Sequence, residues 1–207
     1  ELQTEEGSTL QGYMKSDRAV HYLLGCMNTD ATLAGTIMPT SYKEATLLGI
    51  IKEGTGTLRI TGNNNFLSGS LRILDGRVLV NNDRAQAETK KMRGGLGAMS
   101  DATKPIAFVF GKRVLGGTGS IGGCVDNYGT IEPGDSAVGT LTMKNYVTLS
   151  KNANLILHPA SVLRFKVQNA QSYDQLVVNG NVSFSDMCED FSTSDKMPQV
   201  TRSRSEE

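Results

Sequence analysis

Three acidic residues that lie close together among glycines are the best candidates for chemistry in this sequence. Asp126, Glu132 and Asp135 all fall within the glycine-rich stretch 115–143. Paired carboxylates can serve as general acid and base in the cleavage of polysaccharides, if the fold brings them onto one face. The alternative is turn chemistry, because Asp and Glu beside glycine are typical of tight turns. Since no cluster of Lys or Arg is evident near these acids, we expect no catalytic residues. If the chain does act on an acidic polysaccharide, these three acids are the expected catalytic residues.

The histidines and cysteines form no catalytic or metal-binding pattern. His21 and His158 are far apart in the sequence, and His158, which precedes a proline, is expected to end a strand. Cys26, Cys124 and Cys188 fit no metal-ligand spacing such as C-x-x-C. We expect isolated thiols, with a single disulfide and one unpaired cysteine as the alternative. We also expect no metal and no cofactor.

A glycan-binding face is a second candidate site. Arg164 and Lys166 alternate with apolar residues, and Tyr146 and Tyr173 are the aromatic side chains that could line the same face. Sugar sites usually stack rings on aromatic side chains, but the chain has no Trp and only 6% aromatic residues. The charged side of a strand is more often simply solvated, and the same explanation covers the short basic run 89–93.

The composition argues against several classes of protein. Among 207 residues, 21 Lys and Arg balance 21 Asp and Glu, so no excess charge favours nucleic acid or an anionic membrane. No apolar run reaches the roughly 18 residues that span a bilayer. We therefore expect no nucleic-acid partner and no membrane insertion. Because the chain starts at Glu1 rather than Met, we expect a processed piece, which could also support another domain.

The glycines at 117–122 match G-x-G-x-x-G, a pattern that binds dinucleotides only where a helix follows. The next residues, 124–136, contain glycine and proline and lack the helical spacing of apolar residues. We interpret the glycines instead as corners in a stack of short strands, because glycine adopts positive φ without steric cost. Pro133 and Gly134 should set one such corner, with Asp135 bonded to the backbone of its own turn.

Short strands are expected along most of the chain, because runs of period two recur between turn residues. The expected strands are 32–37, 45–51, 56–62, 70–76, 77–82, 139–143, 146–150, 153–158, 161–167, 174–180 and 181–186. This spacing fits a sandwich, a meander or a parallel β-solenoid. The many glycine and asparagine corners favour the solenoid. Segment 16–27 is either a strand or one short helix.

The expected organisation is one all-β domain. It covers 1–186, with irregular N-terminal coils or a cap over 1–50 and an irregular insert near 83–104, where charged residues and glycine replace the strand pattern. Residues 187–207 are expected to form a C-terminal cap or a polar tail, because they end in a solvated run of charges.

Residues 51–82 resemble the autotransporter-associated β-strand repeat, whose usual form is close to K-x-G-x-G-x-L-x-L-x-G-x-N-x-Y-x-G. Phe66 stands in the aromatic position of this template, and the other matching positions are Lys52, Gly54, Gly56, Leu58, Ile60, Gly62 and Asn64. The stretch 115–143 is similar to the adjoining piece of such passengers, and 173–184 resembles the turn that follows. The resemblance covers 51–82 and 115–186, whereas 1–50 matches weakly and 83–104 departs from the pattern.

The resemblance implies a right-handed single-stranded parallel β-helix, of the pectin-lyase-like shape, that is secreted by a bacterium or exposed on its cell surface. It implies a non-catalytic structural or adhesion module that presents or spaces other domains. Its partner would be an unidentified host or matrix protein or glycan, and end-to-end self-association is possible for an open stack of coils. The alternative is a carbohydrate-active or carbohydrate-binding β-helix that acts on an acidic polysaccharide through Asp126, Glu132 and Asp135.

Overall fold

The computed structural model describes residues 2–12, 20–39, 48–63, 65, 67, 69–83, 96–97, 105–144, 153–185 and 199–204. Every regular element within these ranges is a β-strand, so the predicted all-β class is confirmed for the described part of the chain. Among the pairs of strands described there, only β17 (Val162–Asn169) and β18 (Ser172–Tyr173) are antiparallel.

Three larger sheets and one strand pair contain all the described strands. The seven-stranded sheet has the order β2 (Val20–Leu24), β5 (Leu48–Lys52), β7 (Leu71–Ile73), β10 (Pro105–Val109), β13 (Cys124–Asn127), β16 (Ala153–Leu157) and β20 (Gly180–Phe184). The eight-stranded sheet has the order β18, β17, β14 (Thr130–Pro133), β11 (Val114–Gly117), β8 (Arg77–Val80), β6 (Thr57–Ile60) and β3 (Ala31–Leu33), with β21 (Gln199–Arg204) beside β17. The four-stranded sheet has the order β19 (Gln175–Val178), β15 (Thr140–Lys144), β12 (Ser120–Gly122) and β9 (Leu96–Gly97), and β1 (Thr9–Gly12) pairs with β4 (Thr36–Pro39).

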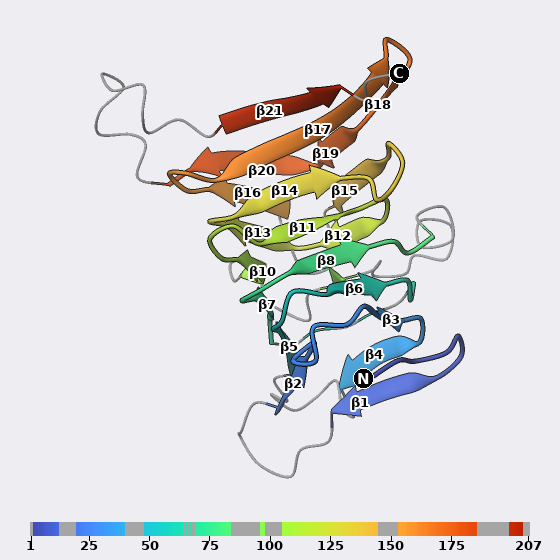
Figure 1. The fold of residues 1–207 in the computed structure, drawn as a ribbon. Coiled ribbons are helices and arrows are strands. Elements are labelled where there is room, and N and C mark those ends of the chain that lie inside the picture. The colour runs from blue at the N-terminus through green and yellow to red at the C-terminus, as the bar shows by residue number, and fades with distance from the viewer. Residues whose placement is uncertain are drawn as a thin grey trace.

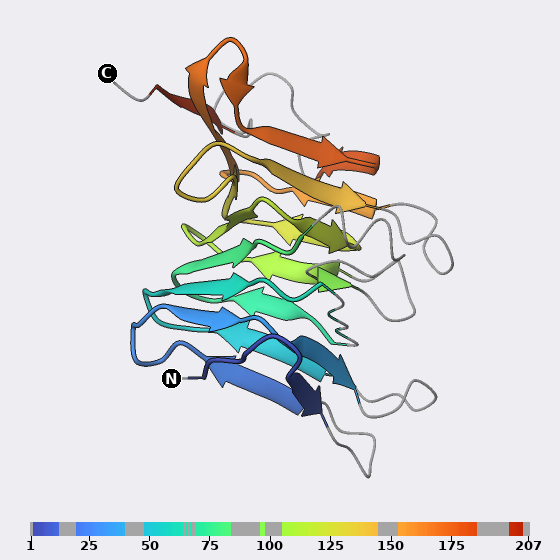
Figure 2. The ribbon, with the colours of Figure 1, turned by 90° about the vertical axis from the view of Figure 1, so that its right-hand side faces the viewer.

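From β7 onward the chain visits the three larger sheets in a repeating order. β7 belongs to the seven-stranded sheet, β8 to the eight-stranded sheet and β9 to the four-stranded sheet, and β10, β11 and β12 repeat the sequence. Figures 1 and 2 show the strands stacked in chain order from the blue N-terminal end to the red C-terminal end. Long parallel sheets visited in this way are consistent with a β-solenoid. One passage of the chain through the three larger sheets is called a coil.

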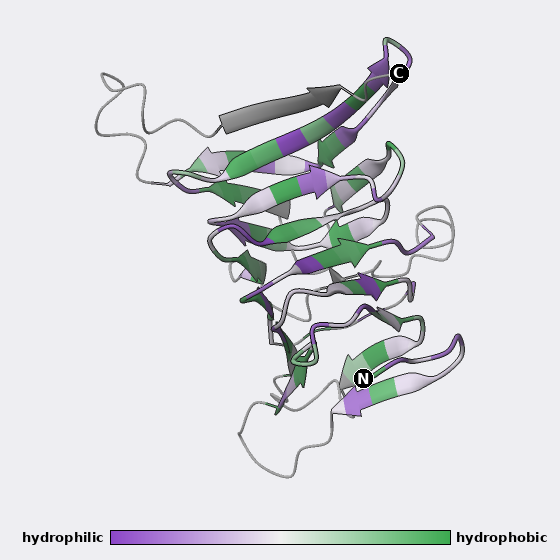
Figure 3. Ribbon diagram, viewed as in Figure 1, coloured by the Kyte–Doolittle hydropathy of each residue, from purple (hydrophilic) through white to green (hydrophobic). Residues whose placement is uncertain are grey.

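In strands with a period-two pattern, such as β6 and β7, one side lies in the core. In β6, Leu58 and Ile60 are buried, whereas Thr57 and Arg59 lie on the other side and remain partly exposed. Figure 3 shows the same alternation along β17, where hydrophilic bands separate hydrophobic ones. The described strands that were expected in 56–82, 139–143 and 153–186 are confirmed, and segment 146–150 lies outside the described residues.

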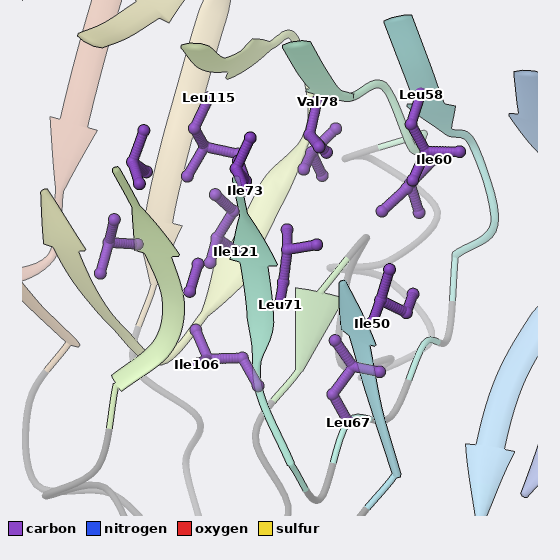
Figure 4. Close-up of a cluster of buried hydrophobic side chains, with 14 of the residues drawn as sticks. Ile50, Leu58, Ile60, Leu67, Leu71, Ile73, Val78, Ile106, Leu115 and Ile121 are labelled. Atoms are coloured by element: carbon purple, nitrogen blue, oxygen red, sulfur yellow. The ribbon is translucent and has the colours of Figure 1, made fainter. Parts of the chain in front are cut away.

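The core consists of columns of aliphatic side chains at equivalent positions of successive strands. Leu58 pairs with Val78, Val78 with Leu115, and Leu115 with Ile131, and all four are buried. Figure 4 shows side chains from the three larger sheets gathered in this interior, among them Leu71, Leu115 and Ile121. Burial of one such side chain stabilises the fold by about 1.5–3 kcal/mol. The stack is therefore held together mainly by contacts between neighbouring coils.

The structure of the glycine-rich stretch 115–143 differs from the expectation that its glycines form corners. Gly116 and Gly117 lie inside β11 and Gly122 inside β12, so these glycines do not simply turn corners. A Cβ atom on Gly116 would lie 2.0 Å from the backbone oxygen of Glu132 on the next strand. Glycine is required there because the neighbouring backbone comes too close for a side chain. No helix follows the motif, since β13 begins at Cys124, and the dinucleotide interpretation is excluded as expected.

The described part of residues 1–50 contains the strands β1 to β4 and the start of β5. Segment 16–27 contains the strand β2, and no helix is found in its described part, 20–27. The single strand expected at 32–37 is two strands, β3 and β4, which belong to different sheets. Within 83–104 the structure describes Asp83 and β9, which joins the four-stranded sheet. Within 187–207 it describes β21, which pairs in parallel with β17.

Candidate functional site

The candidate acids lie on two different sheets. Asp126 belongs to β13 in the seven-stranded sheet, and Glu132 belongs to β14 in the eight-stranded sheet. Asp135 follows the end of β14 after Gly134, whose φ is +83°. The structure therefore brings Glu132 and Asp135 to the end of one strand and places Asp126 in the other sheet.

Asp126 is paired with a histidine from the next coil. Its Oδ1 atom lies 2.5 Å from Nε2 of His158, which immediately follows β16 as the sequence predicted. Both side chains are largely buried. The amide of His158 also donates to the carbonyl of Asn127, so the two coils are joined through both backbone and side chain. The carboxylate and the imidazole hold each other in place.

A row of aromatic rings leads to this pair. The rings of Phe108, Phe110 and Tyr128 are nearly parallel, with centroid distances of 6.1 Å for each successive pair. Tyr128 then stacks on His158 with its centroid 3.6 Å away and an interplanar angle of 12°. Stacked rings of this kind contribute about 0.5–1.5 kcal/mol per pair beyond the area that they bury. The row could not be recognised from the sequence, because its members come from three different coils.

Glu132 lies between two guanidinium groups. Its Oε2 atom accepts a hydrogen bond from Nη1 of Arg164 at 3.1 Å, and its Oε1 atom accepts one from Nη2 of Arg77 at 3.4 Å. The two arginines belong to β17, which is next to β14, and to β8, which lies beyond β11 on the other side, so the carboxylate links separate strands of the sheet. Glu132 is nearly buried, whereas both arginines are partly exposed.

Asp135 also bonds to side chains of earlier coils. Its Oδ2 atom accepts a hydrogen bond from Nδ2 of Asn81 at 2.9 Å and lies 3.4 Å from Nε of Arg59. Arg59 donates in turn to Asp30 at 2.9 Å, and the Thr57 amide together with this guanidinium holds the pKa of Asp30 below its usual value. The expectation that the Asp135 carboxylate bonds to its own turn is wrong, because it reaches across the sheet instead.

These contacts correct the expectation that no cations lie near the candidate acids. Arg77 and Arg164 contact Glu132, and Arg59 contacts Asp135. The cations were not evident in the sequence because they are contributed by other strands, 32 to 76 residues away from their partners. A carboxylate whose oxygens are already bonded to guanidinium donors ties coils together and is poorly placed to accept a proton from a substrate.

The cations of the candidate glycan-binding face are also bonded within the protein. Arg164 contacts Glu132, and Nζ of Lys166 lies 3.2 Å from Asp174 and donates to the carbonyl of Pro133 at 3.0 Å. Tyr173 is exposed in β18, and Tyr146 lies outside the described residues, as does the basic run 89–93. Arg164 and Lys166 are therefore parts of ion pairs rather than unoccupied cations.

Lys52 is a deeply buried charged residue, with 1% of its surface exposed. Its Nζ atom donates to the carbonyl oxygens of Glu53 and Gly54 at 2.6 Å each, and it lies 3.4 Å from the carbonyl of Asp75. Burial lowers the pKa of this ammonium group. The sequence template marked this lysine, and the structure shows that its charge joins the turns of two successive coils.

The cysteines behave as isolated thiols where they are described. Cys26 is exposed, with its Sγ 3.7 Å from the Glu53 carboxylate, and Cys124 is buried in β13. Burial raises the pKa of the Cys124 thiol to about 11. Cys188 lies outside the described residues. Among the described residues, no group of three or more His, Cys, Asp or Glu side chains is placed to hold a metal ion.

The two described thiols should differ strongly in reactivity. We expect Cys124 to react with iodoacetamide at pH 8 about 100-fold more slowly than an ordinary thiol, because burial raises its pKa from 9.0 to about 11 and thiolate is the reactive species. Cys26, which is exposed, should react faster than Cys124. Peptide mapping by mass spectrometry at successive times reports each cysteine separately. Equal labelling rates in the folded protein would contradict the burial of Cys124.

Replacing Glu132 by glutamine should lower stability rather than remove an activity. We expect Glu132→Gln to reduce the free energy of unfolding by about 1 kcal/mol, since the two arginines lose a charged acceptor but are themselves partly solvated. The corresponding loss in Tm is about 2–4 °C. Glu6→Gln, at an exposed turn, is the matched control and should change Tm by less. If the two variants melt alike, Glu132 does not tie the coils together.

No protein-family model matches this chain, and no curated protein matches it at a significant level. In the ranges that the structure describes, no helix has the length and hydropathy needed to cross a membrane. The assignment of a function therefore depends on the residues and their geometry.

Proposed function

We propose that this chain is a non-catalytic structural or adhesion module, secreted by a bacterium or displayed on its surface, that spaces or presents other domains. The observation that supports this proposal best is that the candidate acids are bonded to other side chains of the protein. Asp126, Glu132 and Asp135 are each bonded to a side chain of another coil, at distances between 2.5 and 3.4 Å. Groups arranged in this way stabilise a stack of coils along its length, which is what a spacer requires.

We further propose that the fold is a right-handed single-stranded parallel β-helix of the pectin-lyase-like shape. The order in which the chain visits the three larger sheets supports this proposal, as do the parallel registers of the seven-stranded sheet. The resemblance of 51–82 to the autotransporter-associated repeat supports both the handedness and the location outside the cell. An experimental structure of this chain would test the handedness directly.

Self-association through the C-terminal end of the stack is part of the same proposal. Val182 and Phe184 in β20 are 45% and 48% exposed, and β20 pairs only with β16 among the described strands. Such an edge can pair with a second copy of the chain. Sedimentation velocity over a range of concentrations measures the association, which a Val182→Lys variant should weaken.

The alternative is a carbohydrate-active β-helix that acts on an acidic polysaccharide. It is separated from the spacer by a turnover assay on polygalacturonate with and without calcium, in which new unsaturated or reducing ends are measured. We expect no product. Product formation that is lost in Asp126→Asn, Glu132→Gln or Asp135→Asn would overturn the non-catalytic assignment. Binding to an array of matrix proteins and host glycans then identifies the partner of the adhesion module.

A further inference from the structure

A pocket of about 390 Å³ lies over the turns that join the seven-stranded sheet to the eight-stranded sheet. Three successive turns contribute to its lining, through Thr55, through Asp75 and Gly76, and through Lys112 and Arg113. These turns stack directly on one another, because the amide of Val114 donates to the carbonyl of Gly76 at 3.2 Å. The pocket is therefore built on the regular backbone of the stack.

Positive charge predominates in this pocket. Arg77, Lys112 and Arg113 line it together with a single carboxylate, that of Asp75. Nε of Arg113 lies 3.6 Å from Oδ1 of Asp75, which is beyond hydrogen-bonding distance, and that oxygen already accepts a bond from the Gly76 amide at 2.9 Å. Lys112 is exposed and has no ion pair within the described part of the chain.

The two arginines of the pocket are incompletely bonded. The Nε atoms of Arg77 and Arg113 are buried and have no hydrogen-bond partner among the described residues. The one carboxylate that contacts Arg77, Glu132, is 3.4 Å away and is bonded more closely to Arg164. Arg59, by comparison, is held by two aspartates. The buried Nε atoms cannot reach a ligand, but both arginine side chains are about one third exposed, so other N–H groups of each guanidinium can face one. Their planar geometry suits an oxyanion.

An exposed aromatic residue lies beside the pocket on the next coil. Tyr128 is 41% exposed, and it precedes Gly129, where a Cβ atom would lie 2.7 Å from the carbonyl oxygen of Arg113. The turn at 128–129 therefore packs directly on the turn that carries Lys112 and Arg113. The faces of the Tyr128 ring are covered by Phe110 and His158, so its exposed edge, which carries the hydroxyl, is the part left for a ligand. A hydroxyl next to a group of cations offers a second polar contact to an acidic sugar, which a free inorganic anion does not need.

We propose that this pocket binds the oxyanion of an acidic sugar residue, a carboxylate or a sulfate, within an extended glycan. Lys112, Arg113 and Arg77 supply the charge and the donors, and Tyr128 contacts the neighbouring part of the glycan. The inference rests on the adhesive part of the proposed function, for which it names the partner class, and it is independent of the spacer role. The site involves binding only, with no covalent step.

The test is calorimetric titration of the full chain with polygalacturonate and with heparin at low ionic strength. Neutral dextran is the control polymer, and sodium sulfate and sodium phosphate are the inorganic probes. We expect saturable binding of at least one acidic polymer that weakens with added salt. A Lys112→Gln/Arg113→Gln double variant should raise the Kd at least tenfold. Arg72→Gln, which removes an exposed arginine of β7 outside the pocket, should leave the Kd unchanged.

The remaining outcomes each decide a point. Equal Kd values for the double variant and Arg72→Gln would overturn the site, and so would the absence of binding to both polymers. Sulfate or phosphate that binds as tightly as the polymers do, per site, would overturn the glycan assignment in favour of a free oxyanion. Melting curves confirm that the variants fold, and the single variant Lys112→Glu provides the same test if the double variant does not. If the chain binds matrix proteins on the array but neither acidic polymer, the glycan site is overturned and the proposed adhesion function is not.

Discussion

Replacing Lys52 by methionine is expected to lower the free energy of unfolding by about 3 kcal/mol, and Tm by roughly 6–12 °C. Methionine fills nearly the same volume as the lysine stem, so the change mainly removes the ammonium group. That group donates to the carbonyls of Glu53 and Gly54 at 2.6 Å each. Without it, these oxygens lose their donor at a turn from which water is largely excluded.

The position of the ammonium group explains the size of the effect. Gly25, Gly54 and Gly76, each with positive φ, stand at the corresponding turns of three successive coils. A Cβ atom on Gly25 or Gly76 would lie 3.0 or 2.9 Å from Nζ of Lys52, so the charge sits directly under these turns. One buried cation thus satisfies backbone carbonyls that the bends in the chain leave without strand partners.

A matched substitution separates this role from a general effect of losing charge. Lys112→Met removes an exposed lysine and should change stability by less than about 0.5 kcal/mol. Urea denaturation at pH 7 gives both values, together with the slopes that report whether the unfolded states are comparable. If Lys52→Met is no more destabilising than Lys112→Met, the carbonyl contacts of Lys52 contribute nothing to stability.

The difference in stability between wild type and Lys52→Met should depend on pH with a defined sign. Burial lowers the pKa of Lys52 below its ordinary value of 10.5, so below that value the unfolded chain binds more protons at this site than the folded chain. The stability that Lys52 contributes should therefore increase as pH rises toward 10.5 and decrease as pH falls through the lowered pKa. The difference between wild type and Lys52→Met, measured at pH 8 and pH 10, isolates this site from the other titrating groups.

The strands could be predicted from the sequence because their signal is local. Leu58 and Ile60 alternate with polar residues, and this period of two determines which side of β6 is buried before any partner strand is known. The same holds for β7, in which Leu71 and Ile73 are buried and Arg72 is exposed. The spacing between strands left a sandwich, a meander and a parallel solenoid open, and the glycine and asparagine corners favoured the parallel arrangement.

The contacts between coils could not be predicted in the same way. Asp126 and His158 are 32 residues apart, and Arg77 and Glu132 are 55 residues apart. The length of chain in one coil varies with the loops between strands, so no fixed interval in the sequence marks residues that will lie side by side. For this reason the candidate acids could be named, but their partners could not. The basic pocket at Lys112 and Arg113 was missed because its members come from separate turns.

Replacing Gly116 by alanine is expected to lower the free energy of unfolding by about 3–4 kcal/mol, although the change adds one methyl group. The new Cβ atom would lie 2.0 Å from the backbone oxygen of Glu132 and 3.3 Å from Cδ2 of Leu79. A side chain could rotate away, but the carbonyl of Glu132 belongs to β14, which pairs with β11 over Gly116 itself. The two strands must therefore separate near the centre of the eight-stranded sheet.

Gly7→Ala is the informative comparison, because it separates backbone strain from crowding between coils. Gly7 has a φ of +82°, but a Cβ atom there would meet nothing within 4 Å. The strain of a left-handed alanine should cost about 1 kcal/mol, whereas Gly116, which has no positive φ, should suffer from crowding alone. Urea denaturation of the two variants measures both quantities. A Gly116→Ala variant no less stable than Gly7→Ala would mean that the coils can move apart at little cost, and that the glycines of β11 are not required by close stacking.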